Sequence, residues 1–229
     1  MKKLLSNLSQ LFFPKTCLAC KNILTDDEQS ICHHCLSELP YTHFLIGTNN
    51  LMYQKLSPYI NIEGAYSLVY FRKRGNIQEI LHQLKYKNHQ EIGELFGKIM
   101  AERINENKEY PQFDFIIPIP LHPKKYKKRG YNQLTFLCKT LADKLNCSCE
   151  ENLLIKVKHN KSQTHKNMQE RKENVQGIFQ LKQPEKFSGK HFLLIDDVMT
   201  TGATLESAAK ELLKINEAKL SIATLAMVE

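Results

Sequence analysis

Residues 192–204 read FLLIDDVMTTGAT, and the organisation of the whole chain can be worked out from this segment. The apolar run predicts a buried strand over 192–195 that ends in two acids, Asp196 and Asp197. A turn of small residues follows and opens a helix. In a parallel sheet, ligands bind at the carboxyl ends of the strands, so this turn is a candidate ligand site.

The turn has the chemistry of a phosphate site. Thr200, Thr201 and Thr204 offer hydroxyls, and the start of the helix offers free backbone N–H groups and the positive end of its dipole. Gly202 and Ala203 are small enough to let a phosphate approach the backbone. The two carboxylates before the turn can accept hydrogen bonds from the vicinal hydroxyls of a ribose. An acid pair that only caps the helix is the alternative, but it leaves the threonines and the glycine unexplained.

Strands and helices alternate on either side of this segment. The pattern predicts strands over 64–71, 113–119, 153–157, 192–195 and 220–228, with apolar residues at helical spacing between them. Such alternation is typical of an α/β fold, a mainly parallel sheet with helices on both faces. The run Gly93-x3-Gly97-Lys98 is one residue short of a P-loop and lies in a predicted helix.

The segment before residue 41 needs another source of stability. It contains Cys17-x2-Cys20-x11-Cys32-x2-Cys35 and has no apolar periodicity long enough to form a core. Two CxxC pairs at this spacing supply four thiolates for a tetrahedral Zn²⁺, and the metal would stabilise the segment. A redox CxxC is less favoured, because such pairs occur singly. His33 or His34 could replace a cysteine, but we expect both to be exposed.

These features predict three parts: an N-terminal helix and four-cysteine zinc finger over 1–45, a linker over 46–62, and the α/β domain over 63–229. With 42% hydrophobic and 24% charged residues, the chain is not disordered in the main. A mean hydropathy of -0.41 and the lack of an apolar run of about 20 residues predict no membrane span. The start does not fit a signal peptide, which predicts a cytoplasmic protein with reduced thiols.

The net charge of +8 is concentrated in one quarter of the chain. Residues 122–177 contain 13 Lys or Arg and five Asp or Glu. An excess of positive charge that is confined to one stretch indicates an anionic partner such as phosphates or nucleic acid. A solvated loop is the alternative for its densest part, which consists of Lys124, Lys125, Lys127, Lys128 and Arg129.

At residues 192–204 the chain resembles the type I phosphoribosyltransferases, whose signature binds phosphoribosyl pyrophosphate. Over nearly its whole length it resembles the ComF competence proteins. The motifs that carry this second resemblance, besides the four cysteines, are Pro118-Ile119-Pro120-Leu121-His122-Pro123, Arg129-Gly130-Tyr131-Asn132-Gln133, Gln163, and Arg171-x2-Asn174-Val175-x-Gly177-x-Phe179. The resemblance implies a type I phosphoribosyltransferase-like domain with a zinc finger, in a cytoplasmic protein of natural transformation (DNA uptake) that handles single-stranded DNA.

The resemblance also implies roles for individual residues. Asp196 and Asp197 would hold the ribose hydroxyls and be the catalytic residues of any transfer, and the 200–204 turn would hold the phosphate. The turn after Pro120 would be the pyrophosphate loop, and residues 159–177, with Arg171, would close over the site. The basic residues of 124–129 would then neutralise pyrophosphate together with Mg²⁺, or bind single-stranded DNA. Lys85 matches a family position, and competence machinery such as a helicase is an implied partner.

The sequence and its resemblances suggest three candidate functions. The preferred one is a ComF-type protein that binds phosphoribosyl pyrophosphate with Mg²⁺ and single-stranded DNA. The second is an active phosphoribosyltransferase, whose base pocket would have to come from residues 41–75, where no base-reading motif is present. The third, a regulator that reads duplex DNA through its finger, ranks last because residues 1–50 carry four basic and four acidic residues.

Overall fold

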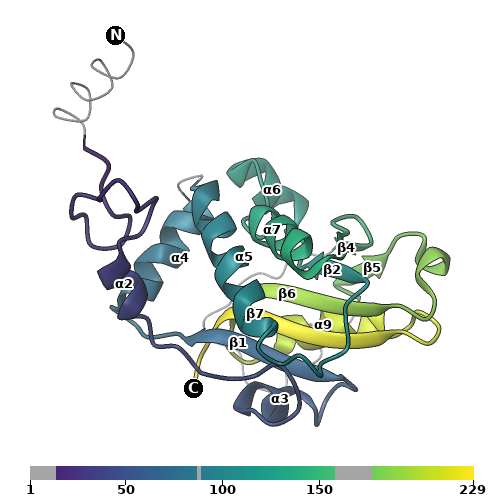
Figure 1. Cartoon of the computed structure of the whole chain (residues 1–229). Helices are drawn as coiled ribbons and strands as arrows, with labels where there is room; N and C mark the ends of the chain where they lie inside the picture. Colours follow the sequence, from purple (N-terminus) through teal and green to yellow (C-terminus); the bar gives the residue numbers. More distant parts are fainter. Residues whose placement is uncertain (1–13, 87–88, 158–176) are drawn as a thin grey trace.

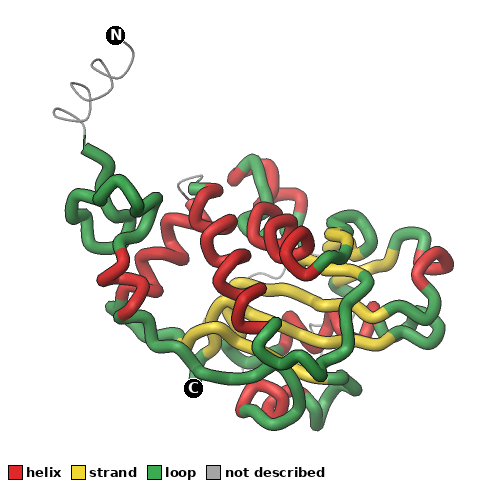
Figure 2. The backbone as a smooth tube through the Cα atoms, in the orientation of Figure 1, coloured by secondary structure: helices red, strands yellow, loops and turns green. Residues whose placement is uncertain are grey.

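A five-stranded parallel sheet forms the centre of the computed structural model, which describes residues 14–86, 89–157 and 177–229 (Figures 1 and 2). Every neighbouring pair of strands in this sheet is parallel. The strands, in their order across the sheet, are β1 (Gly64–Tyr70), β7 (Lys219–Met227), β6 (His191–Met199), β2 (Phe115–Pro118) and β3 (Ser148–Cys149).

The middle strands are apolar because both of their faces are covered. In β6 the residues from His191 to Ile195 are all buried, and in β7 only Lys219 is exposed. A strand buried on both sides reads as a continuous apolar run rather than as an alternation. The predicted parallel sheet is therefore confirmed.

Helices lie in two layers on opposite faces of the sheet (Figure 1). One layer contains α4 (Asn76–Tyr86), α5 (Gln90–Ile104) and α7 (Thr135–Leu145), and the other contains α3 (Leu51–Leu56) and α9 (Ala203–Leu212). Within the parts of the chain that the structure describes, no helix is long and apolar enough to cross a bilayer.

The glycines of α5 serve packing rather than phosphate binding. A Cβ on Gly97 would lie 2.7 Å from the carbonyl oxygen of Leu137 in α7, so the two helix backbones approach each other closely here. A Cβ on Gly93 would likewise lie 3.1 Å from the backbone nitrogen of Leu137. The resemblance of this run to a P-loop is therefore explained by helix packing.

Strand β6 is longer than the predicted strand over 192–195. Its register with β7 continues through Asp196 opposite Thr224 to Met199 opposite Met227. Backbone pairing tolerates the two acids because their side chains face a polar cavity. Asp196 and Asp197 thus lie within the strand and not after its end.

The predicted strand over 153–157 does not join the main sheet. Strand β4 (Leu154–Lys156) instead pairs antiparallel with β5 (Phe179–Leu181), and a 3₁₀ helix follows at Pro184–Phe187. A short strand cannot be assigned to a sheet from its own sequence, because its partner lies more than 20 residues away. The consequence is a second, two-stranded sheet in addition to the main one.

Residues 46–62, predicted to be a linker, lie against the sheet. Gly47 bridges antiparallel to Ala65 on the outer edge of β1, which covers part of that edge. Helix α3 begins at the N-cap Asn50 and buries Met52 and Leu56 in the main core. The limits 1–45, 46–62 and 63–229 stay a prediction, but the middle segment is packed.

Candidate functional site

A cavity of about 210 Å³ opens beyond the carboxyl ends of β2 and β6. From β2 the chain crosses through α7 to β3 at one edge of the sheet, and from β6 it crosses through α9 to β7 on the other side. The strand order therefore reverses between β2 and β6, which is the position where open α/β sheets bind ligands. The cavity is lined by Ile119, Pro120, Leu121, His122, Lys125, Gln133, Lys156, Asp196, Asp197, Val198 and Thr204.

The two predicted acids both reach this cavity, but their surroundings differ. The carboxylate of Asp197 is buried, with Lys85 Nζ 3.0 Å from Oδ1 and Gln133 Nε2 donating to Oδ2 at 2.6 Å. Asp196 is only partly buried, and its Oδ1 accepts from the backbone N–H of Asp197 at 2.8 Å. Both carboxylates keep lone pairs that can accept hydrogen bonds from the hydroxyl groups of a ligand.

Asp196 is the titrating acid of the site. Burial and, to a smaller extent, the neighbouring charge of Asp197 raise its pKa, with a net result of about 7. The backbone N–H of Asp197 and the charges of Lys85 and Lys156 oppose this shift. Near neutral pH this carboxyl group therefore exchanges a proton, and a ligand that requires its ionised form will bind with a pH dependence.

The predicted phosphate turn connects β6 to α9. Gly202 adopts a φ of 77°, and a Cβ there would lie 3.0 Å from Leu56 Cδ2 of α3. The positive φ favours glycine at this position, and a Cβ would fit only if the Leu56 side chain moved slightly. Ala203 begins α9, whose first N–H groups have no partner inside the helix. Thr204 lines the cavity, while Thr200 and Thr201 are exposed on the turn.

The basic run forms a helix, α6 (Pro123–Arg129), and not a loop. His122 caps its start, Pro123 stands at the first position, and Gly130 ends it with a φ of 82°. Lys125 lines the cavity, and Lys124 and Lys127 are exposed, while the side chain of Lys128 is outside what the structure describes.

Arg129 differs from the lysines of α6. Its Nη1 donates to Gln133 Oε1 at 2.7 Å, and its guanidinium lies 4.8 Å from the centre of the Tyr86 ring. Arg129 therefore contacts Gln133, which lines the cavity, but is not itself among the lining residues. Arg171 and Gln163, together with most of the predicted closing loop, lie outside the described residues.

Lys156 is a site residue that the sequence analysis missed. It stands in β4, lines the cavity, and lies with its ammonium 5.1 Å from the centre of the Phe179 ring. Burial lowers its pKa, and the like charge of Lys125 lowers it further. No sequence signal could identify it, because its approach to the acids depends on how β4 is placed.

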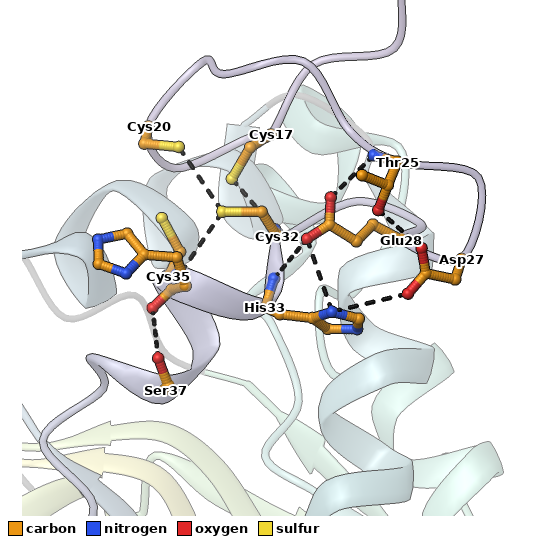
Figure 3. Close-up of polar contacts among 10 residues, drawn as sticks. Cys17, Cys20, Thr25, Asp27, Glu28, Cys32, His33, Cys35 and Ser37 are labelled. Atoms are coloured by element: carbon orange, nitrogen blue, oxygen red, sulfur yellow. Dashed lines mark hydrogen bonds and ion pairs between the residues drawn. The ribbon is translucent and has the colours of Figure 1, made fainter.

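The second candidate site is the cysteine cluster of the N-terminal segment (Figure 3). The sulfur atoms of Cys17, Cys20, Cys32 and Cys35 all lie within 4.8 Å of one another, and those of Cys20 and Cys32 are 3.7 Å apart. A Zn²⁺ with four Zn–S bonds of about 2.3 Å would hold its sulfurs about 3.8 Å apart. All four are free thiols, so the cluster fits a tetrahedral metal and not a disulfide.

Local hydrogen bonds orient these thiols. Burial raises the pKa of Cys17, but backbone N–H groups of Cys20, Cys32 and Ala19 outweigh burial and bring it down to about 6. Helix α2 (His33–Ser37) starts directly after Cys32, whose sulfur accepts from the N–H of Cys35. Zinc requires deprotonated thiolates, which the lowered pKa favours at Cys17, whereas burial raises the pKa of Cys32 and Cys35.

The two histidines of this segment are not part of the cluster. Both are exposed, and Nδ1 of His33 faces Asp27 at 3.7 Å and Glu28 at 3.8 Å (Figure 3). Among the described residues the metal-ligating group contains cysteines alone. The predicted four-cysteine ligand set therefore has the geometry of a zinc finger.

Comparison with known families defines the class of the larger domain. Residues 133–228 match the family described as Phosphoribosyl transferase domain, from Gln133 beside the cavity to the end of β7. This part of the chain is similar to phosphoribosyl transferase domains, and the predicted fold class is confirmed.

Named relatives make the assignment more specific. The chain is 30% identical over 146 residues to DNA utilization protein YhgH of Salmonella typhi, which covers 62% of this chain and 63% of the relative. It is 27% identical to Competence protein F of Haemophilus influenzae, over 83% of this chain and 82% of the relative, and 33% identical to Competence protein ComFC of Bacillus subtilis, over 62% and 55%. The protein is a homologue of these proteins, which confirms its resemblance to the ComF competence proteins. The match spans less than two thirds of the YhgH relative's length.

Two solved structures of phosphoribosyltransferases are similar to this chain at low sequence identity. An adenine phosphoribosyltransferase is 16% identical, with a TM-score of 0.40, and covers 77% of this chain and 89% of its own. A purine phosphoribosyltransferase from Pyrococcus horikoshii is 20% identical, with a TM-score of 0.37, and covers 59% of this chain and 73% of its own.

Proposed function

We propose that this protein acts in competence, binding phosphoribosyl pyrophosphate with Mg²⁺ in the cavity between β2 and β6 and single-stranded DNA along α6. The names of its homologues support the competence role. Its seven cysteines are all unpaired, which supports a cytoplasmic location. Protein partners would belong to the competence machinery, for example a helicase.

The observation that carries the proposal is the division of charge inside one cavity. Asp196 and Asp197 form one wall, and Lys125 and Lys156 line the same cavity from α6 and β4. A ligand that matches both must combine hydroxyl donors with several anionic groups. Phosphoribosyl pyrophosphate has this combination, since its ribose hydroxyls meet the acids while its phosphates meet the cations and the 200–204 turn.

Each group has a specific task in this binding mode. The two acids accept hydrogen bonds from the ribose hydroxyls, and the N–H groups at the start of α9 donate to the 5′-phosphate, with the hydroxyls of Thr200, Thr201 and Thr204 beside them. Lys125 and Lys156 neutralise the pyrophosphate, whose Mg²⁺ arrives with the ligand. Arg171, from the segment outside the described residues, would add a further cation.

Calorimetric titration with phosphoribosyl pyrophosphate and Mg²⁺ tests this directly. We expect binding to the wild type and a loss of about 100-fold or more in Asp196→Asn, because an amide cannot replace an ionised acceptor at the diol. Asp143→Asn, an exposed acid of α7, is the control and should bind like the wild type. Equal affinity of all three proteins would place the ligand elsewhere.

The DNA surface rests on the exposed part of α6. Lys124 and Lys127 are exposed there, and Tyr126 between them is 52% exposed, so its ring is available for stacking on a base. Tyr131 is not available in the same way, because its hydroxyl donates to the carbonyl of Leu84 at 2.6 Å and its ring is partly buried. We therefore assign stacking to Tyr126 alone within this surface.

Salt dependence of binding to labelled oligothymidylate tests the surface. Replacing Lys124, Lys125, Lys127 and Lys128 with alanine should reduce the slope of log affinity against log salt by up to about 3, since each phosphate contact contributes about 0.7. The matched control replaces four exposed lysines on other parts of the chain, Lys98, Lys108, Lys214 and Lys219. Retention of the wild-type affinity and slope in the first variant would refute the DNA assignment.

An active phosphoribosyltransferase is the second candidate function. The acids and the cation wall favour it, since a transfer to a base needs stabilisation of the departing pyrophosphate. Asp196 and Asp197 would then be catalytic residues. Release of pyrophosphate in the presence of one base of a panel would support this function, and binding without turnover by any base would leave the binding role.

A further inference from the structure

Asp197 is held from both sides by residues of other elements. Lys85 at the end of α4 contacts one carboxylate oxygen at 3.0 Å, and Gln133 contacts the other at 2.6 Å. Lys85 is not among the residues that line the cavity, whereas the two acids on which it acts are. Its side chain is 24% exposed and that of Asp197 is 11% exposed, so water screens this pair little.

The amide of Gln133 is itself fixed in one orientation. A guanidinium can only donate and a carboxylate can only accept, so Oε1 must face Arg129 and Nε2 must face Asp197. Arg129 also donates to the hydroxyl of Tyr86 at 3.3 Å and lies over its ring. Tyr86 follows Lys85 in the chain, so α4 supplies the residues at both ends of this series of contacts.

We propose that Lys85 is a positioning residue for the ribose site, which holds the carboxylate of Asp197, with Gln133, in the orientation that accepts a ribose hydroxyl. This inference rests on the proposed binding of phosphoribosyl pyrophosphate. It adds a residue from α4, an element outside the span of 133–228 that matches the family. A carboxylate without these two donors would rotate and would also be left as a buried charge without a partner.

Lys85 acts on the second acid through its charge. The groups that act electrostatically on Asp196 are Asp197, Lys85 on α4 and Lys156 on β4. Lys85 lowers the pKa of Asp196, so its removal should leave that carboxyl protonated up to a higher pH. A residue that merely supported the fold would not shift this titration.

The test compares three variants by calorimetric titration with phosphoribosyl pyrophosphate and Mg²⁺ between pH 6 and 9. Lys85→Met should lower the affinity about 10- to 100-fold at pH 7, as expected for a lost hydrogen bond to a charged group. It should also shift the midpoint of the pH profile upward. Lys85→Arg should recover most of the affinity, because a guanidinium can donate to the same oxygen.

The control is Lys190→Met. Lys190 forms an ion pair of the same length, 3.0 Å, with Asp114, and it stands next to the opposite end of β6. This variant should bind within twofold of the wild type and keep its pH profile. If Lys85→Met does not fold, Lys85→Gln, which keeps a donor without the charge, replaces it and should show the same shift.

The outcomes separate the two proposals. A wild type that binds no phosphoribosyl pyrophosphate refutes the proposed function, and this inference with it. A wild type that binds, together with a Lys85→Met variant of equal affinity and pH profile, refutes only the role of Lys85. A loss of affinity that arginine does not recover and that leaves the pH profile unchanged also refutes it, since it would indicate a structural role.

Discussion

The cysteine cluster and the cavity between β2 and β6 both gather side chains from distant positions, but they are held in different ways. The segment around the cysteines is almost all loop, with α2 as its one helix within the described residues (Figure 2). The cavity lies at the ends of β6 and β2, whose apolar residues are mostly buried. Order in the first region depends on what four sulfurs bind, whereas order in the second comes from the sheet before any ligand arrives.

The largest effect should follow from removing the metal of the finger. Cys32→Ser or a strong chelator should unfold residues 15–40, since apparent zinc-binding free energies of about 10–16 kcal/mol are lost. Hydrogen exchange should show this loss of protection, while the thermal transition of the larger domain persists. Metal analysis should find about one Zn²⁺ per wild-type chain.

The matched control is Cys147→Ser, which changes a thiol outside the cluster and should keep its zinc. Full zinc content in a variant with both Cys17 and Cys20 replaced would show that the cluster is not the metal site. If the finger and the larger domain unfolded together, the order of the larger domain would also depend on the metal, and the two regions would not differ in this respect.

In the larger domain, the free energy of unfolding should depend on pH through Asp196 of the cavity. The folded pKa of Asp196, about 7, lies above the ordinary value of 3.8, so the folded protein retains a proton that the unfolded chain releases between these two values. The free energy of unfolding should therefore fall as the pH rises from about 4 to about 7. The change is on the order of a few kcal/mol.

Asp196→Asn is the variant that isolates this effect. It removes the titrating group, so its free energy of unfolding should exceed that of the wild type at pH 8 and vary less between pH 4 and 7. Urea unfolding at several pH values measures both. Parallel curves for the two proteins would mean that Asp196 does not carry the pH dependence.

The smallest effect should come from the phosphate turn. Gly202→Ala should lower the free energy of unfolding by about 1–2 kcal/mol, because alanine is strained at positive φ, and the new Cβ should also press on Leu56. Gly189→Ala is the control, since its φ of 71° is similar but the nearest atom, Glu217 Oε2, is 3.9 Å away. Equal losses in the two variants would show that the contact with Leu56 adds nothing.

Several features could be predicted from the sequence because they depend on neighbours in the chain. The spacing of Cys17, Cys20, Cys32 and Cys35 predicted the cluster, and the run over 192–204 predicted the strand, the turn and the acids. Pro123 and Gly130 are also local signals, typical of the start and the end of a helix, although the sequence analysis did not predict α6 from them.

Other features depend on contacts between residues far apart in the sequence. The sequence by itself determined which residues are acidic, basic or thiol-bearing and in which type of element most of them stand. Only the tertiary structure decided that β4 pairs with β5 and brings Lys156 to the acids, that α3 lies behind Gly202, and that Lys85 reaches Asp197. Periodicity reports which face of an element is buried, but the partner on that face is selected by packing across the whole fold.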